Sequence, residues 1–239
     1  MADDNKPMKY ARYAIGEIVL VVIGILIALQ INTWNEDRKS KFEEKRILEG
    51  IYVEFEKNQQ MLESCMNTNM VAQQNMLLIM NCIGKEESEL KQVNLDHLLL
   101  LSFDHKKYFP SQHSLNELIQ SGKMQYLSNL KLKALLNAWS SSMDQMDDMF
   151  DNVDRKVEDD IIPYLSKKYP LKDMDMYGHL AWKEPSVLSS NKFSILKELE
   201  FENLIDDNMY RMKNYIKSLH KLENLIDDII KESQQYKNE

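Results

Sequence analysis

Proline and glycine are scarce in this chain of 239 residues, which holds only 5 prolines and 6 glycines. Such a shortage of helix breakers, together with abundant Met, Leu, Ile, Lys and Glu, favours helix throughout. No stretch of useful length alternates apolar and polar residues, so the sequence gives no sign of strands. The predicted fold class is therefore all-α.

Motifs that carry chemistry are missing as well: there is no GxSxG, no phosphate-cradling glycine loop and no HExxH. The histidines share no ligand spacing, and we expect them to be exposed to solvent: His97, His105, His113, His179 and His220. Paired aspartates lack the alternating spacing and the glycine of a calcium loop, so we expect solvated helix faces at residues 147–148, 159–160, 206–207 and 227–228. The sequence predicts no enzyme, no metal and no cofactor.

Cysteine is rare too. Cys65 and Cys82 fall in one predicted helix, where their separation would be about 25 Å, while a disulfide needs Cα atoms within about 7 Å. They cannot pair with each other there. We expect two small buried apolar residues, with an interchain disulfide in an oligomer as the alternative.

Acidic residues outnumber basic residues after residue 35. Three acidic and three basic side chains cancel in residues 1–35, so the net charge of −8 belongs to the rest of the chain. An acidic domain argues against nucleic acid as a partner, because phosphate neutralisation needs a basic patch. It also argues against tight adhesion to anionic lipid.

What the sequence does have is one long apolar stretch between Tyr13 and Trp34, interrupted by Glu17 and Gln30. As a helix it would place Tyr13 and Trp34 about 31 Å apart, close to the roughly 30 Å hydrocarbon core of a bilayer. Aromatic rings commonly anchor a span at its two interfaces. We predict a transmembrane helix over 13–34 and a bilayer as partner.

The same stretch could open a secretory signal, since three basic residues precede it in residues 1–12. Ala28 is followed two positions later by bulky Gln30, which makes a poor cleavage site and favours a retained anchor. Glu36 and Asp37 directly follow the span. We therefore expect a short cytoplasmic N-terminus over 1–12, a bacterial inner-membrane location and a periplasmic domain.

One face of the anchor combines small and polar residues. At 100° per residue, the positions of Glu17, Gly24, Ala28 and Asn35 fall within an arc of about 40°. Small residues four apart let helix backbones approach closely, and a carboxylate inside a membrane costs at least about 2.5 kcal/mol. A structural role in helix association is favoured over an ion or proton pathway. The candidate residues are Gly16, Glu17, Gly24, Ala28, Gln30 and Asn35.

Residues 35–239 are predicted to form an antiparallel helical bundle that continues the anchor outside the membrane. Its expected helices cover about 36–83, 89–102, 114–121, 129–164 and 192–235, with a loop over 169–191. Apolar residues follow the a/d spacing of a coiled coil in the three longest helices. The predicted core positions include Leu135 and Met149 in 129–164 and, in 192–235, Phe201, Ile205, Met212, Tyr215, Leu219, Leu222, Ile226 and Ile229. Asn58 and Asn69 occupy the same stripe and are predicted to be register-setting polar layers.

Two local signals refine these helices. The sequence Ser114-Leu-Asn-Glu117 fits a capping box that opens a helix ended by Gly122. Pro163 should kink or end the helix that begins near residue 129.

Residues 10–38 resemble the N-terminal signature of a family of uncharacterised Bacteroidetes membrane proteins. The shared pattern is a Tyr-Ala-Ile-Gly-Glu entry, an apolar span, and an Ala-Leu-Gln-Ile…Trp-Asn-Glu exit. The resemblance implies a single-pass protein with a helical domain and a retained anchor. It implies no activity.

These observations favour a membrane-anchored, self-associating helical scaffold, interaction or sensing protein of the bacterial envelope without catalytic activity. Its expected partners are a second copy of the chain and, as a further candidate, another envelope protein. The alternative is a subunit of an oligomeric ion- or proton-conducting assembly with Glu17 near the axis. A tethered hydrolase is the third class, and it lacks a recognisable nucleophile or metal site.

Overall fold

One helix, α1 (Lys6–Met80), runs without a break from the N-terminal stretch to the far end of the molecule in the computed structural model, which describes residues 6–188 and 191–234. Its 75 residues span about 110 Å at 1.5 Å per residue. The side chains of residues 6–11 and of Tyr13 lie outside the described part, and so does the predicted interface role of Tyr13.

All elements in the described ranges are helical, which confirms the predicted all-α class. After α1 the elements are η1 (Glu87–Glu89), α2 (Leu95–Phe103), α3 (His113–Gln120), η2 (Lys123–Tyr126), α4 (Leu130–Arg155), the π-helical η3 (Lys156–Ile161), α5 (Ile162–Lys168), α6 (Leu171–Asp175), η4 (Lys192–Lys197) and α7 (Leu199–Ser233).

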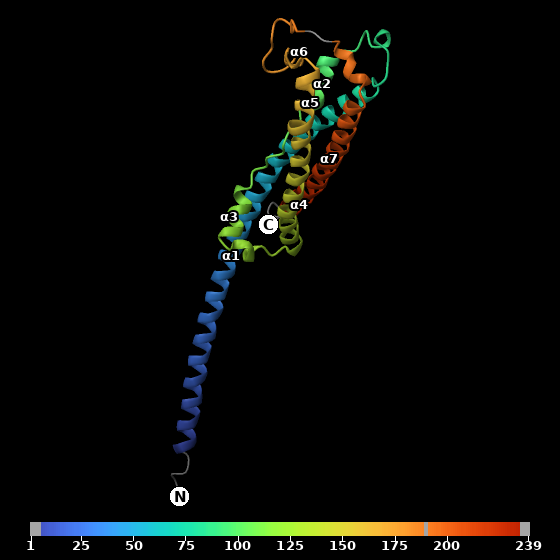
Figure 1. The fold of residues 1–239 in the computed structure, drawn as a ribbon. Coiled ribbons are helices and arrows are strands. Elements are labelled where there is room, and N and C mark those ends of the chain that lie inside the picture. The colour runs from blue at the N-terminus through green and yellow to red at the C-terminus, as the bar shows by residue number, and fades with distance from the viewer. Residues whose placement is uncertain (1–5, 189–190, 235–239) are drawn as a thin grey trace.

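The bundle has an up-down-up-down order (Figure 1). α1 and α4 run away from the anchor end, while α7 returns toward it and packs against both. The second, descending member is composite: α2 lies at the distal end, α3 lies at the anchor end, and residues 104–112 join them as an extended segment. We call residues 104–112 the strap. It fills the place that a continuous helix would take in a regular four-helix bundle.

The apolar heptad positions form the core. On α7 the predicted positions are all completely buried: Phe201, Ile205, Met212, Tyr215, Leu219, Leu222, Ile226 and Ile229. On α4 the predicted Leu135 and Met149 are only partly buried, and their neighbours Leu136 and Phe150 face the core instead. The register of α4 is therefore shifted locally from the simple a/d pattern.

Several predicted boundaries need correction. The predicted spans 13–34 and 36–83 form one continuous helix, as expected for a first bundle helix that continues the anchor, but this helix ends at Met80 and not at residue 83. The helix expected over 89–102 begins at Leu95, where the Asn94 side chain accepts a hydrogen bond from His97 N at 3.1 Å. The region predicted as a loop over 169–191 contains α6.

The helix predicted over 129–164 continues through Pro163 to Lys168, although it changes character. A π-helical turn over residues 156–161 comes directly before the proline, and Pro163 then lies in the first turn of α5, where its missing N–H is tolerated. The helix predicted over 192–235 starts as the 3₁₀ turn η4 before α7, and residue 235 lies outside the described ranges.

Both cysteines are buried and free, as expected for small apolar residues. Cys65 lies on α1, whereas Cys82 lies in the turn after α1 and not in the helix itself. That turn includes Gly84, whose φ of +73° is unfavourable for a residue with a Cβ.

The two glycines Gly84 and Gly50 should respond to alanine with opposite signs. We expect Gly84→Ala to lower the free energy of unfolding by about 1 kcal/mol, because left-handed backbone is strained for other residues. Gly50 lies in α1, where an added Cβ meets Ser114 Oγ at an ordinary 3.6 Å, so Gly50→Ala should raise stability by up to about 1 kcal/mol. Chemical unfolding of the full chain in mild detergent, followed by tryptophan fluorescence, would measure both. Destabilisation by Gly50→Ala would contradict the described packing.

Candidate functional site

The first functional element is the apolar part of α1, which stands clear of the bundle (Figure 1). Its most apolar 18-residue window has a mean hydropathy of 2.6, and none of that window is buried. Trp34 is 62% exposed at its end, with the Arg38 guanidinium 5.7 Å from the centre of the indole ring. By length and composition, this stretch is the one candidate membrane span among the described residues.

The predicted anchor-face residues all lie on this part of α1. Gly16, Glu17, Gly24, Ala28 and Gln30 are exposed, and Asn35 is half-buried. A Cβ added at Gly16 or Gly24 would meet no other described atom within 4 Å. The fold therefore leaves this face free of the chain's own bundle, and its role in association or in a pathway stays a prediction.

The second element is the strap, whose backbone is held by two asparagines of α1. Asn69 accepts from Lys106 N at 3.1 Å and donates to Lys106 O at 2.9 Å. Asn58 repeats this arrangement, accepting from Ser111 N at 2.8 Å and donating to Ser111 O at 2.7 Å. Both asparagines are completely buried. They do set a register, as predicted from the heptad stripe, but against an extended segment and not against another helix.

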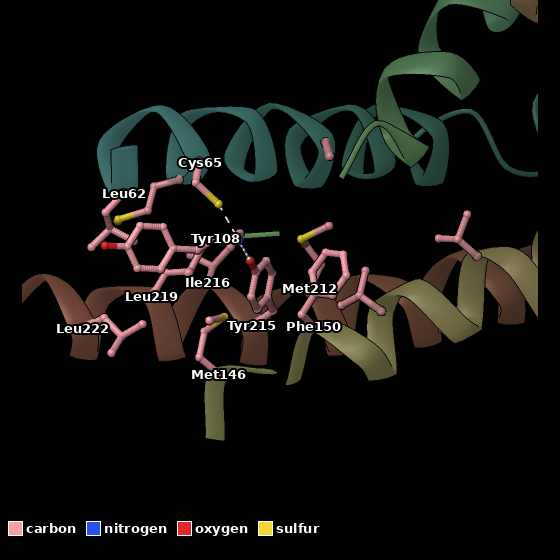
Figure 2. Close-up of a cluster of buried hydrophobic side chains, with 14 of the residues drawn as sticks. Leu62, Cys65, Tyr108, Met146, Phe150, Met212, Tyr215, Ile216, Leu219 and Leu222 are labelled. Atoms are coloured by element: carbon pink, nitrogen blue, oxygen red, sulfur yellow. Dashed lines mark hydrogen bonds between the residues drawn. The ribbon is translucent and has the colours of Figure 1, made fainter. Parts of the chain in front are cut away.

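A buried tyrosine of α7 completes the inner face of the strap. The Tyr215 hydroxyl donates to Lys106 O at 3.0 Å and accepts from Tyr108 N at 3.1 Å. The Cys65 thiol donates to the same Lys106 carbonyl at 3.2 Å. Figure 2 shows Cys65 and Tyr215 pointing toward each other across the bundle next to Tyr108. Burial raises the pKa of both the Cys65 thiol and the Tyr215 hydroxyl, so each keeps the proton that it donates.

The lower end of the strap runs into α3, whose N-terminus is capped from α1. The buried Glu54 carboxylate accepts from Ser111 Oγ at 2.7 Å, Ser114 N at 3.1 Å and Leu115 N at 3.2 Å. The predicted capping box from Ser114 to Glu117 is therefore wrong, because Ser114 lies inside the helix. A carboxylate from another helix meets the free N–H groups and the positive end of the helix dipole.

The outer side of the strap faces acidic residues of α4. His105 Nε2 lies 3.0 Å from Asp154 Oδ1, and the His105 side chain is only 9% exposed. Lys107 Nζ lies 3.0 Å from Asp147 and 3.5 Å from Asp151. Burial alone would lower the pKa of Lys107, but its pairing with Asp147 and Asp151 raises it above the ordinary value.

Two sequence expectations are corrected by these contacts. His105 is not a solvent-exposed histidine, whereas His97, His113, His179 and His220 are exposed. Asp147 does not lie only on a solvated helix face, because its carboxylate also pairs with Lys107 of the strap. The spacing of Asp147, Asp151 and Asp154 on one side of α4 was the available signal. It could not be used without knowing that an extended basic segment lies opposite.

A third cluster ties the distal loop to α2. Lys192 Nζ lies 2.7 Å from both Asp96 Oδ2 and Asp173 Oδ2, and the Asp173 side chain is 3% exposed. Asp173 also accepts from Ser186 N, and Asp96 accepts from the Tyr169 hydroxyl at 2.6 Å. Burial alone would raise the pKa of Asp173, but these partners lower it below the ordinary value. The cluster is structural, since Lys192 meets both carboxylates within the chain.

The polar groups of these three regions are paired mainly within the chain. The described residues contain no group of three or more His, Cys, Asp or Glu side chains that could hold a metal ion. The polar side chains around the strap are used on backbone groups and on one another. These contacts hold segments of the chain in place relative to one another.

Replacing Asn69 by alanine should weaken the strap strongly. The change leaves Lys106 N–H buried without its acceptor, and we expect a loss of about 2 to 3 kcal/mol in the free energy of unfolding. Asn75→Ala is the matched control, because Asn75 bonds only Val71 O of its own helix, and its effect should stay within about 0.5 kcal/mol. Equal effects of the two substitutions in chemical unfolding would contradict the clamp.

The distal cluster predicts a specific dependence on pH. The folded-state pKa of Asp173 is lowered, so its contribution is complete above the unfolded value of about 3.9 and is lost as the pH falls through the folded value. We expect Lys192→Met to cost about 2 to 3 kcal/mol at neutral pH, because it strands a buried carboxylate. In the double variant with Lys192→Met, Asp173→Asn should restore part of the lost free energy of unfolding. It should also reduce the fall in stability as the pH is lowered, which is the acid limb of the curve of stability against pH. An unchanged acid limb in the double variant would exclude Asp173 as its source.

Comparison with known proteins gives a family but no activity. No curated protein and no solved structure matches the chain. The model of a family of unknown function, DUF6090, matches residues 17–142, which covers most of the anchor, the strap and the first part of α4. This match includes more than half of the 239 residues, and the chain therefore belongs to the DUF6090 family of unknown function.

Proposed function

We propose that this protein is a single-pass, self-associating helical module of the bacterial inner membrane that acts as a scaffold, interaction or sensing protein without catalytic activity. In this proposal residues 13–34 cross the bilayer, the N-terminus is cytoplasmic and the bundle is periplasmic. The observation that carries it is α1 itself. One helix is bare over its apolar part and forms the core of the bundle over the rest.

The continuity of α1 supports a role in linking the membrane to a distant point. From Trp34 to Met80 the helix rises about 69 Å at 1.5 Å per residue. No described loop separates the span from the core, so a rotation or tilt of the anchor moves the bundle with it. A scaffold or sensor needs such a rigid connection, whereas a tethered enzyme needs only a flexible one.

The direction of the anchor face supports association with a second copy. Val53 and Val71 follow Glu17 by whole numbers of helical turns at 3.6 residues per turn, and they are 44% and 45% exposed. Leu62 follows Glu17 by twelve and a half turns and is buried in the core. The small-residue face thus points away from the bundle. A parallel second copy can approach Gly24 without meeting the bundle, and a coiled contact between α1 helices can continue above the membrane.

Glu17 supports a second candidate function, an oligomeric ion or proton pathway. It is exposed on the same arc as Gly24 and Ala28, so association through that arc brings several carboxylates near one axis. Glu17→Gln distinguishes the two functions in reconstituted vesicles. A flux that the substitution abolishes favours the pathway, and vesicles without flux, or with flux insensitive to the substitution, favour the scaffold.

Self-association should depend on the small residues of the anchor face. We expect the full chain in mild detergent to have a mass of two or more copies by light scattering. Gly24→Leu should weaken association by at least about tenfold, because the longer side chain separates the helix backbones.

Val22→Leu is the control, since it places the same leucine side chain about 140° away from Glu17 on the helix, although it adds only one methylene group. Its mass should equal that of the wild type. A monomeric wild-type chain, or equal effects of the two substitutions, would contradict association through this face.

A further inference from the structure

A basic and aromatic pocket lies where α1 joins the bundle, at the end nearest the anchor. Its volume of about 730 Å³ falls within the range of small-molecule sites. It is lined by Arg38, Lys39, Phe42, Glu43, Lys123 and Tyr126. Three positive charges against one negative charge leave a local excess of two, in a chain whose net charge is −8. The pocket is therefore a local exception to the acidic character of the domain.

The pocket is assembled from two parts of the chain. Arg38, Lys39 and Phe42 come from α1, and Lys123 and Tyr126 come from η2, which Figure 1 shows beside α1 at the base of the bundle. Gly122 makes the turn into η2 with a φ of +68°.

Lys123 is fixed in this position by an ion pair. Its Nζ lies 3.2 Å from Glu43 Oε2, across 80 positions of sequence. Glu43 Oε2 also lies 3.4 Å from Arg46 Nη2, so the single negative charge of Glu43 is shared between Arg46 and Lys123. Lys123 therefore presents charge into the pocket from a defined place.

The distance from the membrane boundary suits a lipid headgroup. If Trp34 marks the hydrocarbon edge, Arg38 lies about 6 Å and Phe42 about 12 Å beyond it along the helix. The polar headgroup layer is roughly 5 to 7 Å thick on each side of a bilayer. The guanidinium of Arg38 thus lies in that layer, and the long side chains of Lys39 and Lys123 can reach toward it.

Phe42 lines the same pocket from further along the helix. It is 69% exposed although it adjoins the bundle, and at about 12 Å it lies beyond the headgroup layer, so it adds apolar surface to the pocket. Cations recognise phosphate through charge-assisted hydrogen bonds, with Arg able to bind two oxygens at once. Cations beside exposed aromatic rings at the membrane end of a helix suit an amphipathic ligand with a phosphate.

We propose that this pocket binds the phosphate of an anionic phospholipid headgroup and thereby fixes the bundle against the membrane surface. The inference rests on the proposed anchor, and the ligand is drawn from the leaflet on the bundle's side. Binding there restrains the tilt and rotation of the long helix α1 relative to the bilayer.

The full chain in nanodiscs of phosphatidylcholine with a small fraction of brominated phosphatidylglycerol provides the test. Bromine near Trp34 quenches its fluorescence, so quenching measures how strongly phosphatidylglycerol is enriched beside Arg38. Trp139 and Trp182 lie in the bundle and give a constant background, which Trp34→Phe defines. We expect quenching above that given by the same fraction of brominated phosphatidylcholine.

Two variants separate a built pocket from a merely basic segment. Each cation near an anionic surface contributes roughly fivefold in affinity, so Arg38→Gln with Lys39→Gln should reduce the enrichment by about 25-fold. Lys123→Gln should reduce it about fivefold, although Lys123 is far from the span in sequence. Lys131→Gln is the matched control, since it loses a comparable exposed ion pair, with Glu232, but does not line the pocket.

Each outcome decides a different claim. Loss of enrichment in the pocket variants but not in Lys131→Gln supports the proposal. Enrichment that is insensitive to Lys123→Gln overturns the pocket, and displacement by inorganic phosphate at constant ionic strength overturns the assignment to lipid. Failure of the wild-type chain to float with vesicles overturns the proposed anchor, and the lipid site falls with it. Flotation without enrichment overturns the lipid site alone.

Discussion

The unbroken backbone hydrogen bonding of α1 is the constraint on which the rest of the structure depends. One helix has to satisfy two environments, because its first part is bare and apolar and its second part is the principal wall of the bundle. A helix has no soft joint, so the faces of its bare apolar part and the face turned toward the core are fixed relative to each other. Because the rotation of one part of α1 relative to the other is fixed, the small-residue face of the anchor points away from the bundle. The same continuity places Arg38 beside both Trp34 and the base of the bundle.

The strap shows how a helical bundle accommodates an extended segment in place of a helix. A backbone without regular hydrogen bonds is costly to bury unless side chains supply partners for its N–H and C=O groups. Asn58 and Asn69 supply them in matched pairs, and Tyr215 adds a third contact from the opposite helix. The same segment carries His105 and Lys107 outward to α4. The strap therefore adds polar contacts to α1, α4 and α7 beside the apolar core that these helices share.

The sequence was sufficient to predict the long helices. It was insufficient to predict the composite member of the bundle, which consists of α2, the strap and α3. Heptad periodicity identified the core positions of α7, such as Phe201 and Ile229, because these residues pack helix against helix with a regular repeat. It also singled out Asn58 and Asn69 as polar positions within a core stripe. Their partners could not be predicted, since the strap has no periodicity of its own and contacts α1 from far along the chain. The Glu54 cap was hidden for the same reason. Gly16 and Gly24 of the anchor face have open space around them, so the described chain does not test the predicted role of that face.

The continuity of α1 from the candidate membrane span into the bundle is tested most directly by the distance between spin labels at Leu29 and Val53, measured by pulsed electron resonance on the full chain in nanodiscs. Both side chains are exposed, and the native cysteines are buried and can stay in place. A continuous helix predicts one narrow distribution near the axial separation of about 36 Å, allowing for label length, after dilution with unlabelled chain to remove contributions between copies. A broad distribution, or one centred at a much shorter distance, would show a joint between anchor and bundle and would contradict the account.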